Sequence, residues 1–238
     1  MLIIGLKISR FIIMNNPQQL TFPWSKPSRA SFNHFFMEDI NSGVKDALLE
    51  LDDLFLYGIH ETGKSFLLQS ICNYYASNKK SALYIPIKEV KVYGTNFLDS
   101  LENLDLICID DIDLIAGDNE WEIAIFNLIN SCLISECRLI FASNLNPSTI
   151  NFNLIDLISR IKKVDHIEIF PVSSNKIPEA IKFVADLRSI NLGDKEIKYL
   201  TTHSKRNMSD LVNIINKLDN LSLQLKRKIT IPLIKQLI

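Results

Sequence analysis

The sequence has almost no excess of charge of either sign. Its 26 lysines and arginines stand against 27 aspartates and glutamates, which gives a formal net charge of -1. A chain that associates with DNA or an anionic membrane through its overall field needs a large positive excess. The composition therefore excludes polyanion binding by the chain as a whole, and any role at DNA has to be local or borrowed from a partner.

Cysteine and histidine are also scarce, with four of each. The cysteines form no CxxC pair and the histidines form no HExxH pair, so neither of these zinc-site patterns is present. Cys108 lies inside an apolar run, where a thiol packs as a small hydrophobic group. These patterns indicate neither a disulfide framework nor a metal centre built on these residues, and they favour the reducing cytosol.

Long hydrophobic runs are missing too. The apolar stretch over residues 1–13 is interrupted by Lys7 and Arg10, and no small-residue cleavage site follows it. It is too short to span a bilayer and a poor signal peptide, so we predict a cytoplasmic protein. Met14 offers an alternative natural start.

What is present is typical of a soluble α/β protein. Hydrophobic residues make up 47% and charged residues 22% of the 238 residues, enough for an α/β core and a small second module. Near-continuous apolar runs alternate with helical patterns, which predicts a parallel sheet covered on both faces. The expected strands lie near residues 54, 81, 104, 137 and 166.

The chain changes character between Pro171 and Pro178, which bracket a serine- and asparagine-containing segment. After this break every stretch has helical periodicity. We therefore predict three parts, which are a flexible tail over residues 1–28, an α/β core over residues 29–171 and a small helical domain over residues 172–238.

The segment GIHETGKS, residues 58–65, follows an expected strand and opens a helix. In this context the GxxxxGK[ST] pattern wraps backbone N–H groups around phosphates, its lysine reaches the β- and γ-phosphates, and its hydroxyl binds Mg²⁺. The alternative is a glycine-rich turn that arises by chance. The predicted phosphate-binding residues are Gly58, Thr62, Gly63, Lys64 and Ser65, and Ser65 is also a predicted magnesium ligand.

Two carboxylates, Asp110 and Asp111, end the apolar run LICI. Placing both at a strand end is costly without a cation, so we assign Asp110 to the Mg²⁺ shell and Asp111 to orienting the attacking water. Asn144 ends the next strand and is a candidate for contact with the γ-phosphate. The alternatives are ordinary turns, in which aspartate and asparagine are both common. Asp113 is predicted to lie on the surface.

In this order, the motifs resemble those of the AAA+ family, and within it the bacterial replication initiator DnaA and its short regulatory relatives. The resemblance starts near residue 18 and is carried, besides the phosphate loop, by the stretches SFNHFFMEDINS, IAGDNEWEIAIFNL and KRKITIPLIKQL. It implies an AAA+ P-loop NTPase core, with a parallel five-stranded sheet of order 5-1-4-3-2, and a small all-α lid.

The resemblance gives the segment DLISR, residues 156–160, a specific role. In this family the segment carries an arginine finger, so Arg160 would act as a catalytic residue in trans. Such a finger stabilises charge on a transferred γ-phosphoryl group and contributes roughly 10³ to 10⁵ in rate. From the residues alone, an ordinary ion pair at a helix end is an equal alternative.

One residue departs from the family pattern. An arginine of the lid normally reaches the nucleotide, and Ser209 takes its place here. Lys205 and Arg206 lie on the same helical face if the helix extends that far. Unless one of them substitutes, the lid holds nucleotide more weakly, and we expect little intrinsic ATP hydrolysis.

The tail contains QQLTFPW, residues 18–24, ahead of any expected element. Its apolar residues either cover a local patch of the domain or bind another protein. The resemblance favours the second, because these relatives attach to the β sliding clamp of DNA polymerase III through a short peptide of this pattern. An extended peptide with apolar anchors suits a pre-formed groove. The predicted clamp-binding residues are Gln19, Leu20, Phe22, Pro23 and Trp24.

The resemblance implies a regulatory inactivator of replication initiation. Such a protein, bound to ADP or ATP with Mg²⁺ and tethered to the DNA-loaded clamp, would stimulate hydrolysis of ATP on DnaA and prevent re-initiation. It would meet DNA only through the clamp, act at the replisome in the nucleoid, and form a homodimer or higher oligomer. The alternatives are a self-contained ATPase such as a DnaC-like helicase loader, and a scaffold whose phosphate loop only stabilises the fold.

Overall fold

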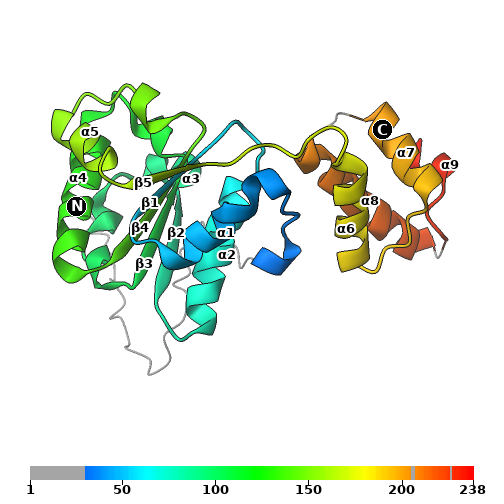
Figure 1. Cartoon of the computed structure of the whole chain (residues 1–238), viewed down its shortest axis with the longest axis horizontal. Coiled ribbons are helices and arrows are strands. Elements are labelled where there is room, and N and C mark those ends of the chain that lie inside the picture. The colour runs from blue at the N-terminus through cyan, green and yellow to red at the C-terminus, as the bar shows by residue number, and fades with distance from the viewer. Residues whose placement is uncertain (1–29, 205–206, 226) are drawn as a thin grey trace, which may run out of the picture.

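The computed structural model describes residues 30–204, 207–225 and 227–238. The predicted clamp-binding peptide at residues 19–24 lies outside these ranges, as do Lys205 and Arg206. The described chain forms an α/β core and a helical lid, joined by the segment that follows the last strand (Figure 1). None of the helices in this part of the chain combines the length and apolar character that a membrane span requires.

Five parallel strands form one sheet in the order β2-β3-β4-β1-β5. This is the predicted order read from the opposite edge, so the predicted fold class is confirmed. The inner strands are apolar and buried because helices cover both faces, while the edge strand β5 is largely exposed. The strands are β1 (Leu54–Tyr57), β2 (Ala82–Pro86), β3 (Leu106–Asp110), β4 (Arg138–Ser143) and β5 (Asp165–Glu168).

Helices cover the two faces of the sheet and pack against alternate residues of each strand, because successive side chains of a strand point to opposite sides. Leu56 and Cys108 pack on the face covered by α1 and α2, whereas Phe55 and Ile107 pack on the face covered by α4 and α5. These elements are α1 (Ser42–Glu50), α2 (Lys64–Ser77), α4 (Asn119–Ser135) and α5 (Ile155–Ile161), and a short α3 (Ile87–Val90) follows β2.

The lid has a hydrophobic core of its own. Ile181, Leu200 and Ile215 are fully buried in it and come from three different helices. The boundary that we predict near residue 171 falls between β5 and the first lid helix. The lid helices are α6 (Ile177–Leu187), α7 (Asp194–His203), α8 (Met208–Leu225) and α9 (Ile231–Ile234).

Two side chains just before α1 form hydrogen bonds with the segment that connects the core to the lid. The Asn41 side chain donates a hydrogen bond to the carbonyl oxygen of Phe170 at 2.8 Å and accepts one from its N–H at 2.9 Å. The Glu38 carboxylate accepts hydrogen bonds from the N–H and the hydroxyl of Ser173. These bonds lower the pKa of Glu38. Residues just before α1 therefore fix the direction in which the chain leaves the core toward the lid.

Phe141 of β4 tests how much the two-sided core contributes. Its side chain is fully buried and stacks on Phe55, with 6.0 Å between the ring centroids. Because Phe141→Ala leaves a cavity, we expect the free energy of unfolding to fall by about 3–5 kcal/mol in urea denaturation. The control is Ile134→Ala on α4, where the side chain is 87% exposed and the change should stay within about 0.5 kcal/mol. Equal losses in the two variants would contradict this description of the core.

Candidate functional site

Two glycines around the loop between β1 and α2 lie where no side chain fits. A Cβ on Gly58 would lie 2.2 Å from the carbonyl oxygen of Ile169, and a Cβ on Gly63 would lie 2.5 Å from the ring of Phe35. Gly63 also has a φ of +92°, in the left-handed region that favours glycine. The loop is therefore packed closely against Ile169 and Phe35, and it leads directly into the N-terminus of α2, where backbone N–H groups suit an anion.

Lys64 begins α2, and its side chain folds back into the loop. Its Nζ donates hydrogen bonds to the carbonyl oxygens of Gly58 and Ile59, both at 2.7 Å, and to Oγ1 of Thr62 at 3.3 Å. Burial lowers the pKa of Lys64, and the negative charges of nearby aspartates oppose this shift. The loop thus holds an ammonium group inside its backbone turn, where it can meet a phosphate.

Asp110 ends β3 as a carboxylate that is only 2% exposed. Its Oδ2 accepts a hydrogen bond from the Tyr84 hydroxyl at 2.7 Å, and its Oδ1 accepts one from the Asp111 N–H at 3.0 Å. Burial raises the pKa of Asp110, while hydrogen bonds from Ser65 and Tyr84 oppose the rise. The two predicted magnesium ligands, Ser65 and Asp110, therefore lie together.

Tyr84 is a site residue that the sequence patterns did not indicate. It lies on β2, beside β3, two residues before the residue that pairs with Asp110. One signal was available, because Tyr84 carries the only side-chain hydroxyl in the strand ALYIP, and the hydroxyl of a buried tyrosine usually has a hydrogen-bond partner.

Asn144 joins the acidic residues after β3 from the end of β4. Its Nδ2 donates a hydrogen bond to Oδ1 of Asp111 at 3.1 Å, and its backbone N–H donates one to Oδ1 of Asp113 at 3.2 Å. The prediction that Asp113 lies on the surface is wrong. The short helical turn Ile112–Ile115 brings this residue toward β4, where it is partly buried.

Arg160 is in the last turn of α5 and takes no part in the hydrogen bonds of this group. It is partly buried, and its side chain has no hydrogen bond or ion pair with residues of the described ranges 30–204, 207–225 and 227–238. The helix-end ion pair that was the alternative for Arg160 is therefore not formed within the described chain. Ser209, in the first turn of α8, is exposed.

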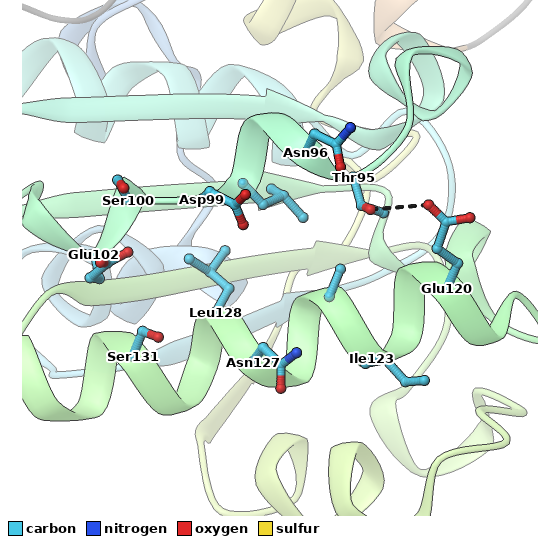
Figure 2. Close-up of a pocket in the computed structure, with 12 residues that line it drawn as sticks. Thr95, Asn96, Asp99, Ser100, Glu102, Glu120, Ile123, Asn127, Leu128 and Ser131 are labelled. Carbon is cyan, nitrogen blue, oxygen red and sulfur yellow. Dashed lines mark hydrogen bonds between the residues drawn. The ribbon is translucent and has the colours of Figure 1, made fainter.

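A groove of about 500 Å³ lies elsewhere, between α4 and the segment that precedes β3 (Figure 2). Three carboxylates, those of Asp99, Glu102 and Glu120, are among its lining residues, and the Thr95 hydroxyl donates a hydrogen bond to Glu120 across it at 3.1 Å. This negative lining disfavours phosphate, and none of the predicted site residues takes part in it. The groove is thus separate from the candidate site.

The phosphate loop and the ends of β3 and β4 have the groups that a nucleotide with Mg²⁺ requires. The loop supplies backbone N–H groups and the Lys64 ammonium, and Ser65 and Asp110 supply oxygen atoms that a hard cation prefers. Gly58 and Gly63 have no Cβ, which lets the loop backbone pack closely against Ile169 and Phe35. The residues therefore fit such a ligand, with Asp111 and Asn144 at the same edge of the sheet.

Comparison with known families covers both parts of the chain. Residues 31–164 match the family described as the bacterial DnaA ATPase domain. Residues 175–238 match the family described as the lid domain of Hda. Both matches agree with the resemblance that the sequence motifs indicate.

Individual proteins show the same pattern. An uncharacterized protein of Haemophilus influenzae is 29% identical over 228 residues, which cover 93% of this chain and 98% of that protein. The crystal structure of domain III of DnaA from Thermotoga maritima has a TM-score of 0.76 at 20% identity, covering 88% of this chain and 95% of that one. AMPPCP-bound DnaA from Aquifex aeolicus has a TM-score of 0.70 at 22% identity, covering 81% and 66%. At these identities the two structures show a shared fold.

The close packing at Gly63 leads to a test of the loop. In Gly63→Ala the new Cβ meets the Phe35 ring and the backbone keeps its positive φ, so we expect a loss of about 2–4 kcal/mol in the free energy of unfolding. Gly117→Ala is the matched control, because Gly117 has a φ of +82° but no atom within 4 Å of the position that a Cβ would take. It should lose only about 1 kcal/mol, and a loss as large as that of Gly63→Ala would show that backbone strain alone is responsible.

Proposed function

This chain belongs to the family of the bacterial DnaA ATPase domain, and we propose that it is a nucleotide-binding regulator that stimulates hydrolysis of the ATP bound to DnaA. In this proposal Arg160 completes the ATPase site of the partner, and the result is less ATP-bound initiator and no re-initiation. The match of residues 175–238 to the lid domain of Hda supports a regulator of this kind.

The phosphate loop of this chain would bind ADP or ATP together with Mg²⁺. Lys64 would contact the phosphates, Ser65 and Asp110 would hold the ion, and Asp111 and Asn144 would lie at the far end of the polyphosphate. The DnaA structure of Aquifex aeolicus with this fold contains bound AMPPCP, which supports a nucleotide ligand. Because Ser209 offers no cation from α8, we expect the bound nucleotide to turn over slowly.

The observation that carries the proposal is the unpaired state of Arg160 within the described chain. A guanidinium group is always charged and has five N–H donors. Arg160 has no carboxylate partner among the described residues, so its donors are available to an anion on another molecule. A γ-phosphoryl group in a neighbouring ATPase site is such an anion, and an arginine supplied there raises the rate by roughly 10³ to 10⁵.

The predicted clamp-binding peptide would act as a tether. If Gln19, Leu20 and Phe22 bind the β sliding clamp, the protein and a DnaA molecule on nearby DNA share a small volume. Tethering of this kind raises the effective concentration without any new contact between the two proteins. The clamp would thereby restrict the stimulation to replicating DNA.

Arg160→Ala tests the role of the guanidinium. In the presence of DNA-loaded clamp, we expect the stimulated release of phosphate from ATP-bound DnaA to fall by about 10³-fold or to the unstimulated rate, while clamp binding is unchanged. Lys163→Ala, which removes an exposed positive charge just after α5, should retain the stimulation. Stimulation that survives in Arg160→Ala would overturn the mechanism, and stimulation without clamp dependence would favour a loader or a scaffold.

The double substitution Leu20→Ala with Phe22→Ala tests the tether. Because a few apolar anchors carry most of the energy of such interfaces, we expect it to abolish capture of the protein by immobilised clamp, with no change in melting temperature. Gln18→Ala lies just outside the matched pattern and should bind the clamp normally. A lower melting temperature in the double variant would instead show that these side chains pack against the domain.

A further inference from the structure

Glu122 is a fully buried carboxylate near the start of α4. Its Oε1 accepts hydrogen bonds from the N–H groups of Gly117 at 2.8 Å and Asn153 at 3.1 Å. Its Oε2 accepts one from the N–H of Leu154 at 2.7 Å. No lysine, arginine or histidine in the described part of the chain forms an ion pair with it. Within the described residues, three backbone N–H groups and the N-terminal end of α4 therefore compensate the burial of this carboxylate.

These bonds hold the start of α5. The N-cap residue of this helix is Leu154, whose side chain cannot accept a hydrogen bond. The first N–H groups of a helix have no partner within the helix, and an α5 of seven residues is too short to be stable by itself. Glu122 provides from a neighbouring helix part of the cap that α5 lacks. A second tie is the hydrogen bond from the Asn153 side chain to Asn119 at 3.2 Å.

The place where α5 begins determines where Arg160 points. Each residue advances a helix by about 100°, so a shift of its first turn would swing the guanidinium across the surface. Leu157 and Ile161 anchor the inner side of α5 in the core. Apolar contacts of this kind are not directional, whereas hydrogen bonds to Asn153 and Leu154 fix both the depth and the rotation of the helix start.

The same carboxylate also binds the connection between β3 and α4. Gly117 belongs to the connection between β3 and α4, and this connection contains Asp113, which binds the backbone of Asn144. Glu122 thus joins the connection between β3 and α4 to the start of the helix that carries Arg160.

We propose that Glu122 is a positioning residue that holds α5, and with it Arg160, in the orientation that acts on the partner's ATP. This inference rests on the proposed function and extends it to a residue that touches neither nucleotide nor partner. An apolar residue would occupy this buried site at lower cost if only packing mattered.

The test compares Glu122→Ala and Glu122→Gln with Glu120→Gln. Glu120 lies on the same helix and is exposed, and within the described ranges its carboxylate accepts a hydrogen bond from Thr95, which does not belong to α5. The first readout is amide hydrogen exchange at residues 153–161. The second is the stimulated rate of ATP hydrolysis on DnaA, titrated with each variant in the presence of DNA-loaded clamp.

In Glu122→Ala we expect exchange of the Leu154 amide and of α5 to rise about tenfold or more. The maximal stimulated rate should fall by about 10²-fold, while the half-saturating concentration and the affinity for ADP stay unchanged. Glu122→Gln should recover part of the rate, because its one remaining oxygen can still accept from Gly117 and Asn153. Glu120→Gln should match the unmodified protein in every readout.

The outcomes separate this inference from the proposed function. If α5 exchanges faster in the Glu122 variants but the maximal rate is unchanged, the positioning role is overturned, while a loss of rate in Arg160→Ala keeps the proposed function. Unchanged exchange at residues 153–161 also overturns the inference. If Arg160→Ala itself retains full stimulation, the proposed function fails and this inference fails with it. Should Glu122→Ala not fold, Glu122→Gln decides the same questions, because it retains the shape of the side chain.

Discussion

Parallel pairing of β1, β3 and β4 is the constraint on which the candidate site depends. Because these strands lie side by side and run in one direction, their carboxyl ends meet at the same edge of the sheet. Gly58 follows β1, Asp110 ends β3 and Asn144 follows β4. Strand pairing alone thus brings a phosphate loop, a buried carboxylate and an amide together. A slip of one residue would turn each side chain to the other face and separate the group.

Much of this edge could be predicted because its signals are local. The phosphate loop and the paired aspartates are short stretches that directly follow apolar runs, so their places at strand ends can be read without the fold. The partners that complete the edge are distant in sequence. Tyr84 is 26 residues from Asp110, and Asp113 is 31 residues from Asn144. Contacts at such separations exist only once the sheet is formed, which is why Tyr84 was missed and Asp113 was wrongly placed on the surface.

Lys64, Asp110 and Glu122 are charged side chains that are buried in positions where apolar residues would make the core more stable. Burial lowers the pKa of Lys64 and raises that of Asp110, so in both cases it disfavours the charged form. Glu122 is a third buried charge, and it was overlooked because it lies beside the apolar stripe of α4, next to Trp121. Departures of this kind are expected at functional sites, and a ligand that binds only the folded protein and contacts Lys64 and Asp110 would offset the cost of burying those two groups.

An arginine that acts on another molecule faces two opposing requirements. Its side chain must keep its hydrogen-bond donors unsatisfied, because a strong internal partner would have to be broken before each encounter. It must also be held in place, because a misplacement of about 1 Å can cost 10²-fold in rate. Under the proposed function, the two requirements would fall on different groups of this chain. Arg160 has no ion pair among the described residues, whereas the backbone that carries it is bound to Glu122 through Asn153 and Leu154. A backbone fixed by hydrogen bonds would leave the guanidinium of Arg160 available, and in our proposal the buried carboxylate of Glu122 meets both requirements.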